Sequence, residues 1–347
     1  MSREYRCKKC GAKFIPDGFP KIRSKFGKGL VIWCAYQMVV GGQNMSRIQI
    51  GLATLFGIRF GVPTIYSFKE TLSFHYKRLY EEILAGLVRR PVLYIDETTA
   101  NLRLESGYVW CITDGRSVYY FYRSSREGLF LKDMLRNFEG VLVSDFYTAY
   151  DSLDCRHQRC LVHLMRDINE EMQRRPFDDE LKLMATKFSN VLKAAVATID
   201  RYGFKARHLA KHRKPAREFC QWASEREFRS APAERLRLRI VKYRDKLFTF
   251  LEYDGVSWNN TYAEHFIKPF AWHRSTANGI FTEHSIQDYL VILSLSGTCA
   301  GRGQNFLEFL LEDNKDAFNF KSARRIGRAV SPTPELAPTI ADQDEPR

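Results

Sequence analysis

The stretch around which this chain is organised is a short apolar run, residues 92–95, that ends in acidic and hydroxyl side chains. Pro91 precedes the run, and Asp96, Glu97 and two threonines follow it. An apolar run between a proline and a polar cluster is typical of a strand that is buried on both faces. The pattern therefore predicts an acid at the exit of a buried strand, where ligands of α/β folds gather. The alternative is that Asp96 only caps a turn.

A second run of the same kind, residues 140–144, leads into Asp145. Between the two runs, residues 108–114 and 117–122 are rich in β-branched and aromatic side chains around an Asp-Gly turn, which predicts a hairpin. Apolar residues at helical spacing predict a helix over residues 127–138. The order is strand, hairpin, helix, strand, with an aspartate ending the first strand and another ending the last. Two carboxylates brought together in this way suit a hard divalent cation.

The N-terminal region is predicted to be helical. Helices are expected over residues 28–40 and 47–56, with Ser46 as the N-cap of the second. Pro63 opens a further helix, and residues 67–88 form an amphipathic one. Two short helices around a glycine-containing turn in a basic chain favour a helix-turn-helix that contacts DNA. The alternative is a helical hairpin that packs on the core.

Composition narrows the class of partner. The 347 residues are enough for two domains or for one large domain with an insertion. The formal net charge of +14 indicates a polyanionic partner, with nucleic acid ahead of a membrane. No apolar run approaches the length of a membrane span, and the polar start is unlike a signal peptide. The 8 cysteines are scattered, so we expect reduced thiols in a cytoplasm.

Two groups of cysteines raise the question of zinc. Cys7 and Cys10 form one knuckle of a zinc ribbon, which is half of a four-ligand site, so either zinc binds there or the thiols bind nothing. Further along, two cysteines and two histidines fall within residues 155–163. That spacing is too compressed for a usual zinc finger, and a strand there would place the side chains on opposite faces. A metal site there is the less favoured interpretation.

A third acid is expected at Glu264. It follows Asn259, Asn260 and the Thr-Tyr-Ala sequence at the predicted start of a helix. The alternative is a capping box in which Glu264 only caps its own helix. Such a helix would place Lys268 one turn below Glu264 on the same face. His273 and Arg274 lie beyond, and with Lys268 they are candidates for phosphate contacts.

Taken together, these motifs resemble the RNase H-like catalytic core of DDE transposases, especially the insertion-sequence-sixty-six-like group of bacterial insertion sequences. The motifs are Ile95-Asp96-Glu97-Thr98, Val143-Ser144-Asp145, Cys160-Leu161-Val162-His163-Leu164, and Asn259-Asn260 with Ala263-Glu264. The resemblance runs over nearly the whole chain. It implies an α/β fold, an RNase H-like mixed sheet with flanking helices, to which an N-terminal helix-turn-helix-like region and an all-helical insertion are added.

The resemblance also implies a division of the chain. The expected parts are a partial zinc-ribbon knuckle at 1–20, a helix-turn-helix-like DNA-binding region at 21–90, the catalytic core at 91–165 and 257–315, a helical insertion at 166–256, and a basic, then disordered tail at 316–347. Arg and Lys crowd the insertion. A charge run is usually a solvated face, but inside a nuclease-like chain phosphate contact is the other interpretation. The residues expected to bind DNA there are Arg207, Lys211, Arg213 and Lys214.

The activity implied is metal-dependent DNA strand cleavage followed by strand transfer. Asp96, Asp145 and Glu264 are expected to hold two Mg²⁺ or Mn²⁺ ions, with Asp96 bridging both. The supporting residues are expected to be Cys160, His163 and Asn260. The expected partner is double-stranded DNA, both at the transposon ends and at the target. At least a homodimer is expected, because two ends must be brought together. The expected location is the cytoplasm, in association with the nucleoid. Two other classes stay open: a hydrolytic nuclease on the same fold, and a non-catalytic DNA-binding relic or recruited regulator.

Overall fold

A five-stranded mixed sheet in the order β5-β4-β3-β6-β7 forms the centre of the molecule. Its strands are β3 (Val92–Asn101), β4 (Ser106–Thr113), β5 (Val118–Arg123), β6 (Val141–Ser144) and β7 (Arg156–Arg159). Strands β3, β4 and β5 pair antiparallel, whereas β6 runs parallel to both β3 and β7. The structure is a computed structural model that describes residues 5–6, 8–11, 13–14, 25–277 and 281–314. The α/β architecture and its mixed sheet agree with the expected fold class.

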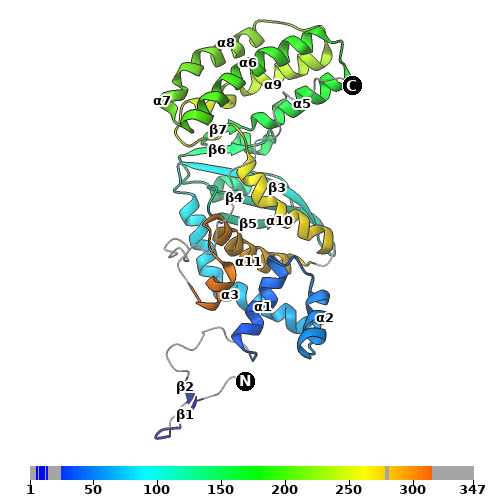
Figure 1. The fold of residues 1–347 in the computed structure, drawn as a ribbon, viewed down its shortest axis with the longest axis vertical. Coiled ribbons are helices and arrows are strands. Elements are labelled where there is room, and N and C mark those ends of the chain that lie inside the picture. Colours follow the sequence, from blue (N-terminus) through cyan, green and yellow to red (C-terminus); the bar gives the residue numbers. More distant parts are fainter. Residues whose placement is uncertain (1–4, 7, 12, 15–24, 278–280, 315–347) are drawn as a thin grey trace, which may run out of the picture.

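Helices surround the sheet and extend the molecule at both ends (Figure 1). They are α1 (Lys28–Val39), α2 (Met45–Phe56), α3 (Val62–Leu87), α4 (Leu129–Met134), α5 (Leu161–Arg174), α6 (Asp179–Tyr202), α7 (Ala206–Leu209), α8 (Arg213–Ser224), α9 (Ala231–Leu247), α10 (Thr261–Ala277), α11 (Glu283–Gly301) and α12 (Phe306–Leu311), with short 3₁₀ turns η1 (Thr148–Ser152), η2 (Ala210–His212) and η3 (Thr249–Leu251). Figure 1 shows α6 to α9 gathered beyond β7 and α1 to α3 at the opposite end. Helix α10 packs against β3 and β4.

Strand β5 forms one edge of the sheet, and helix α11 covers that edge. The backbone N–H groups of Val118 and Tyr120 donate to the hydroxyls of Thr298 (3.1 Å) and Ser294 (3.0 Å). On the same strand, the hydroxyl of Tyr80 in α3 donates to the Tyr120 carbonyl at 2.7 Å. An unpaired strand edge is a template for association with other strands. Helices α11 and α3 therefore satisfy the backbone groups that would otherwise leave this edge open.

The sequence predictions for the core mostly agree with the structure. Strands β4 and β5 form the expected hairpin, and Gly115 in its turn adopts a φ of +85°, which favours glycine. The Asp114 carboxylate accepts the backbone N–H groups of Arg116 (2.9 Å) and Ser117 (2.6 Å), which fixes the turn. Helix α4 is much shorter than the helix expected over residues 127–138.

The N-terminal helices differ from prediction in their ends. Asn44, and not Ser46, caps α2, because its side chain accepts the backbone N–H of Arg47 at 3.0 Å. The turn that follows uses Gly57 in the left-handed conformation, with a φ of +66°. The two helices expected after it form one helix, α3, with Pro63 in its first turn.

One small hairpin is described near the N-terminus. Strands β1 (Tyr5–Arg6) and β2 (Lys13–Phe14) form a small antiparallel hairpin, and Cys10 lies exposed between them. Cys7 and the tail expected at 316–347 lie outside the described residues. Among the described helices, none is both long enough and apolar enough to cross a membrane.

Candidate active site

Asp96 lies inside a strand and not at its exit, which corrects the sequence prediction. Strand β3 continues to Asn101 because it stays paired with β4, where Asp96 is opposite Cys111. Its pairing with β6 stops earlier, at Tyr94 opposite Val143. Extending that register by two residues sets Asp96 level with Asp145. The two aspartates therefore flank the point where the parallel half of the sheet ends, the usual place for a ligand in open α/β sheets.

The pKa of the Asp96 carboxyl is raised to about 8 from its ordinary 3.8. Burial is the largest cause, and the charges of Glu97, Asp145 and Glu264 add to it. The backbone N–H of Glu97, which donates to Asp96 Oδ1 at 3.0 Å, acts in the opposite direction. A buried carboxyl surrounded by three others favours its neutral form unless a cation offsets their charge. The two other predicted acids are thus electrostatic neighbours of Asp96.

Helix α10 brings Glu264 to this position through Asn260. The Asn260 side chain is fully buried and donates from Nδ2 to the carbonyl oxygen of Ile95 at 2.9 Å. Asn260 therefore ties the start of α10 to the residue preceding Asp96. The capping box does not form, because the backbone N–H of Thr261 donates to Asn259 Oδ1 at 3.2 Å and Glu264 Oε1 has no hydrogen-bond partner among the described residues.

Cys160 and His163 meet Glu264 at the start of α5. The Cys160 thiol is fully buried and accepts the backbone N–H of Asn260 at 3.2 Å, which joins the starts of α5 and α10. His163 Nδ1 lies 3.8 Å from Glu264 Oε1. Among the described residues, donor atoms of Cys160, His163 and Glu264 all lie within 4.8 Å of one another. Cys155 and His157 contact each other at 4.0 Å instead, so the four residues separate into two pairs.

Asp145 is held from both its side chain and its backbone. Its Oδ1 accepts the backbone N–H of Tyr147 at 2.8 Å. Its carbonyl oxygen accepts Arg159 Nη1 at 2.7 Å, and the same nitrogen donates to the Ser144 hydroxyl at 2.6 Å. The Arg159 side chain, at the end of β7, is 0% exposed. A fully buried guanidinium thus fixes the turn that carries Asp145.

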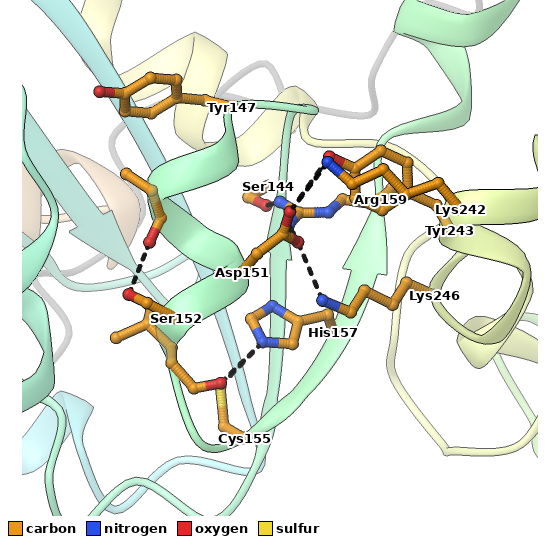
Figure 2. A network of polar contacts seen from close by, with 12 residues as sticks. Ser144, Tyr147, Asp151, Ser152, Cys155, His157, Arg159, Lys242, Tyr243 and Lys246 are labelled. Carbon is orange, nitrogen blue, oxygen red and sulfur yellow. Dashed lines mark hydrogen bonds and ion pairs between the residues drawn. The ribbon is translucent and has the colours of Figure 1, made fainter. Parts of the chain in front are cut away.

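The charge of Arg159 is balanced by Asp151, which also binds side chains of α9 (Figure 2). Figure 2 shows Lys242, Tyr243 and Lys246 of α9 pointing towards Asp151. Lys246 lies 2.9 Å, Tyr243 3.1 Å and Lys242 3.6 Å from its carboxylate oxygens. Burial raises the pKa of Asp151, but the hydrogen bond from Lys246 and the charge of Arg159 outweigh it and lower the pKa to about 2. Asp151 stays ionised and links α9 to the Asp145 turn.

Glu97 is a further buried acid beside the site, and no role was predicted for it from the sequence. Arg126 donates two hydrogen bonds to its Oε1, from Nη2 at 2.6 Å and from Nε at 2.9 Å. The Tyr150 hydroxyl donates to its Oε2. Burial nevertheless raises the pKa of Glu97, since it outweighs these contacts. Glu97 is a paired structural acid, and its charge contributes to the shift at Asp96.

The three residues on α10 that are candidates for phosphate contacts differ in their exposure and in their contacts. Lys268 is exposed. His273 is only 2% exposed and stacks on Tyr289 with ring centroids 4.6 Å apart, and burial lowers its pKa to about 4. A phosphate contact for His273 is therefore wrong, because a neutral, buried ring offers no charge to DNA. Arg274 Nη1 donates to the Thr99 carbonyl at 2.6 Å and holds the far end of β3.

The basic candidates in the helical region are mostly open to solvent. Arg207, Lys211 and Lys214 are exposed. Arg213 is half-buried, and its Nε donates to the Leu251 carbonyl at 3.1 Å. This contact anchors the start of α8 to η3. Arg213 therefore has a partner in another element, whereas Arg207 and Lys214 contact only neighbours in the chain, His208 at 3.0 Å and Glu218 at 3.8 Å.

A comparison with protein families finds a match that covers these residues. A family model described as "Transposase IS66 family" matches residues 23–287, well over half of the chain. The match includes all three predicted acids as well as Cys160, His163 and Asn260. No curated protein matches the chain.

Proposed function

The chain belongs to the transposase IS66 family, and on that basis we propose that it cuts and joins DNA strands during transposition of an insertion sequence. The proposed catalytic residues are Asp96, Asp145 and Glu264, on an RNase H-like core. The observation that carries the proposal is geometric: the β3–β6 register sets Asp96 level with Asp145, and Asn260 ties the start of the helix that carries Glu264 to the residue before Asp96. Carboxylates gathered in one place, with a raised pKa, mark a functional site more often than a structural one.

The residues fit divalent cations. A cation between the acids offsets the charge that raises the pKa of Asp96, and the buried Glu264 Oε1 has no hydrogen-bond partner among the described residues to compete for it. We propose that Asp96, Asp145 and Glu264 would hold Mg²⁺ or Mn²⁺ ions, with Asp96 as the ligand shared with each of the other two acids. Bound there, such ions activate a water or 3′-hydroxyl and stabilise the leaving oxygen at phosphorus. Oxygen ligands favour Mg²⁺.

The surrounding residues prepare this site. Asn260 sets the start of α10 against β3, and Arg159 sets the Asp145 turn. Cys160 joins α5 to α10, so that His163 and Glu264 face each other. Catalytic carboxylates need such support because a displacement of about 1 Å can cost about 100-fold in rate. We propose a supporting role for Asn260 and Cys160 on this ground.

DNA binding is proposed for the exposed basic residues. Lys268 lies one helical turn after Glu264, on the helix that carries the third acid. Arg207, Lys211 and Lys214 lie in the helical region 166–256, which we interpret as an insertion between the second and third acids. Helices α1 to α3 are proposed as a helix-turn-helix-like end-binding region. At least a dimer is expected, since two transposon ends must meet.

The test is an assay of cleavage and joining with the purified chain. Labelled duplexes that carry the terminal repeats of the encoding element are incubated with Mg²⁺, with Mn²⁺ or with chelator. The proposal predicts metal-dependent cuts and strand-transfer products from a free 3′-hydroxyl end. Cuts without joining would indicate a hydrolytic nuclease, and DNA binding without cuts would indicate a non-catalytic DNA-binding protein.

A further inference from the structure

The contact between His163 and Glu264 leaves two polar atoms unsatisfied. His163 Nδ1 and Glu264 Oε1 are both shielded from solvent, and neither has a hydrogen-bond partner among the described residues. They face each other at 3.8 Å, which is too long for a hydrogen bond. A buried polar atom that stays unpaired has lost its hydration without a compensating hydrogen bond. The arrangement therefore suggests a bound species between the two atoms.

The third donor around this gap is a thiol. Cys160 Sγ belongs to the same group, in which all donor atoms lie within 4.8 Å of one another. The backbone N–H of Asn260 donates to this sulfur at 3.2 Å, although burial raises the pKa of the thiol to about 11. Ligand atoms around a tetrahedral zinc ion lie roughly 3.3–3.6 Å apart, given bond lengths of about 2.0–2.3 Å. The three donor atoms are thus up to about 1.3 Å too far apart, and the ion would have to draw them together.

The chemistry of the donors selects the ion. Mg²⁺ prefers oxygen ligands, whereas a thiolate and an imidazole together select borderline-soft ions such as Zn²⁺. We propose that Cys160, His163 and Glu264 form a transition-metal site of the Zn²⁺ class, with a fourth position open to water. Binding forms the metal–sulfur bond and releases the thiol proton to solvent.

This site shares Glu264 with the proposed active site. If Glu264 is the third catalytic acid, as proposed above, a Zn²⁺ ion held by Cys160 and His163 withdraws that carboxylate from the Mg²⁺ ions. Zn²⁺ would then inhibit cleavage in competition with Mg²⁺. Only this consequence rests on the proposed function, because metal binding itself requires no catalysis.

Cobalt provides a readout that is independent of activity. Co²⁺ in a tetrahedral thiolate site absorbs visible light and shows a sulfur-to-metal charge-transfer band, neither of which Mg²⁺ sites give. The experiment uses the full chain with Cys7→Ser and Cys10→Ser, so that the N-terminal thiols do not contribute. One equivalent of Co²⁺ is expected to produce both bands, and Zn²⁺ is expected to displace them.

Variants assign the ligands. Cys160→Ser should abolish the charge-transfer band, and His163→Ala should weaken Co²⁺ binding by at least about tenfold. His163 is partly exposed, so its variant tests the site even if Cys160→Ser fails to fold. Cys155→Ser is the matched control and should leave both bands unchanged, because Cys155 contacts His157 outside the group.

The outcomes separate the inference from the proposed function. Bands that depend on Cys160 and His163 support the site whether or not the chain cleaves DNA. A chain that cleaves DNA with Mg²⁺ but shows no thiolate band with Co²⁺ overturns the inference and leaves the function intact. Bands that survive both ligand variants also overturn it.

Discussion

Arg159 Nη1 donates a 2.7 Å hydrogen bond to the main-chain carbonyl of Asp145, from a side chain that is fully buried. Asp151 neutralises this guanidinium and is itself bound by Lys246 of α9. The hydrogen bond connects the position of one proposed catalytic acid to the helical region. Arg159 is therefore a positioning residue for Asp145.

Arg159→Lys keeps the charge but loses the planar fork that reaches three acceptors. We expect the variant to fold and to need a higher Mg²⁺ concentration for DNA cleavage, with activity partly restored when Mg²⁺ is raised. A Mg²⁺ titration of the cleavage rate measures this. An unchanged Mg²⁺ requirement would show that the hydrogen bond has only a structural role.

Asp151→Asn leaves the buried Arg159 charge without its partner. We expect the free energy of unfolding to fall by about 1.5–3 kcal/mol, the range for hydrogen bonds to charged groups. Urea denaturation measures the loss, and Asp154→Asn is the matched control because Asp154 is exposed on the same segment. Equal stabilities of the two variants would contradict the role of Asp151.

The raised pKa of Asp96 makes stability depend on pH. Between the ordinary pKa of 3.8 and the folded value of about 8, the native chain retains a proton that the unfolded chain has lost. In the absence of metal, the contribution of Asp96 is therefore fully present below about pH 4 and is lost as pH rises through about 8. Asp96→Asn should remove this component. Urea denaturation of both proteins at about pH 5 and about pH 8 with chelator present measures it, and parallel pH dependences would refute it.

Asn260 is expected to matter for the fold and for the third acid. Asn260→Ala removes the bond to the Ile95 carbonyl and leaves that acceptor unpaired in the core. We expect a loss of about 1–3 kcal/mol in stability together with reduced cleavage. Asn259→Ala is the neighbouring control, since the Asn259 side chain accepts hydrogen bonds from residues close to it in the chain. Wild-type stability in Asn260→Ala would contradict the anchoring role.

The exposed basic residues should account for part of the salt dependence of DNA binding. Removing one phosphate-binding charge lowers the slope of log K against log salt concentration by about 0.9. Lys211→Ala and Lys214→Ala should each lower the slope by up to that amount. Arg235→Ala is the control, because its guanidinium is paired with Glu171 of another helix at 3.1 Å, whereas the ammonium of Lys214 lies 3.8 Å from the exposed Glu218 of its own helix. Unchanged slopes for both lysine variants would place the DNA elsewhere.

The sequence could predict the elements whose signal is local. Apolar runs ending in aspartates predicted β3 and β6, and the Asp-Gly turn predicted the hairpin. The position of Asp96 within β3 could not be predicted, because it depends on β4 continuing where β6 stops. Strand ends are thus set by partners that are distant in the chain.

Long-range contacts also explain what was missed at the site. Arg159 lies in a polar strand, Arg-His-Gln-Arg, that carries no apolar signal although three of its residues are buried. Its partner Asp151 is 8 residues away, and Lys246 of α9 is 95 residues from Asp151, so this three-way pairing appears only in the fold. His273 was misassigned for the same reason, since its burial depends on Tyr289 of α11. For Arg159 the available signal was its position, because it is a charged residue in a short strand between the predicted motif that ends at Asp145 and the one that begins at Cys160.

The central claim is that Asp96, Asp145 and Glu264 act together in DNA cleavage. The most direct measurement compares Mg²⁺-dependent cleavage of terminal-repeat DNA by the wild type and by the three single alanine variants. Asp133→Ala is the control, because that acid is 84% exposed on α4. We predict a loss of at least about 100-fold in each of the three variants with DNA binding retained, and wild-type activity in the control. Cleavage that persists in any of the three would contradict the assignment of that acid.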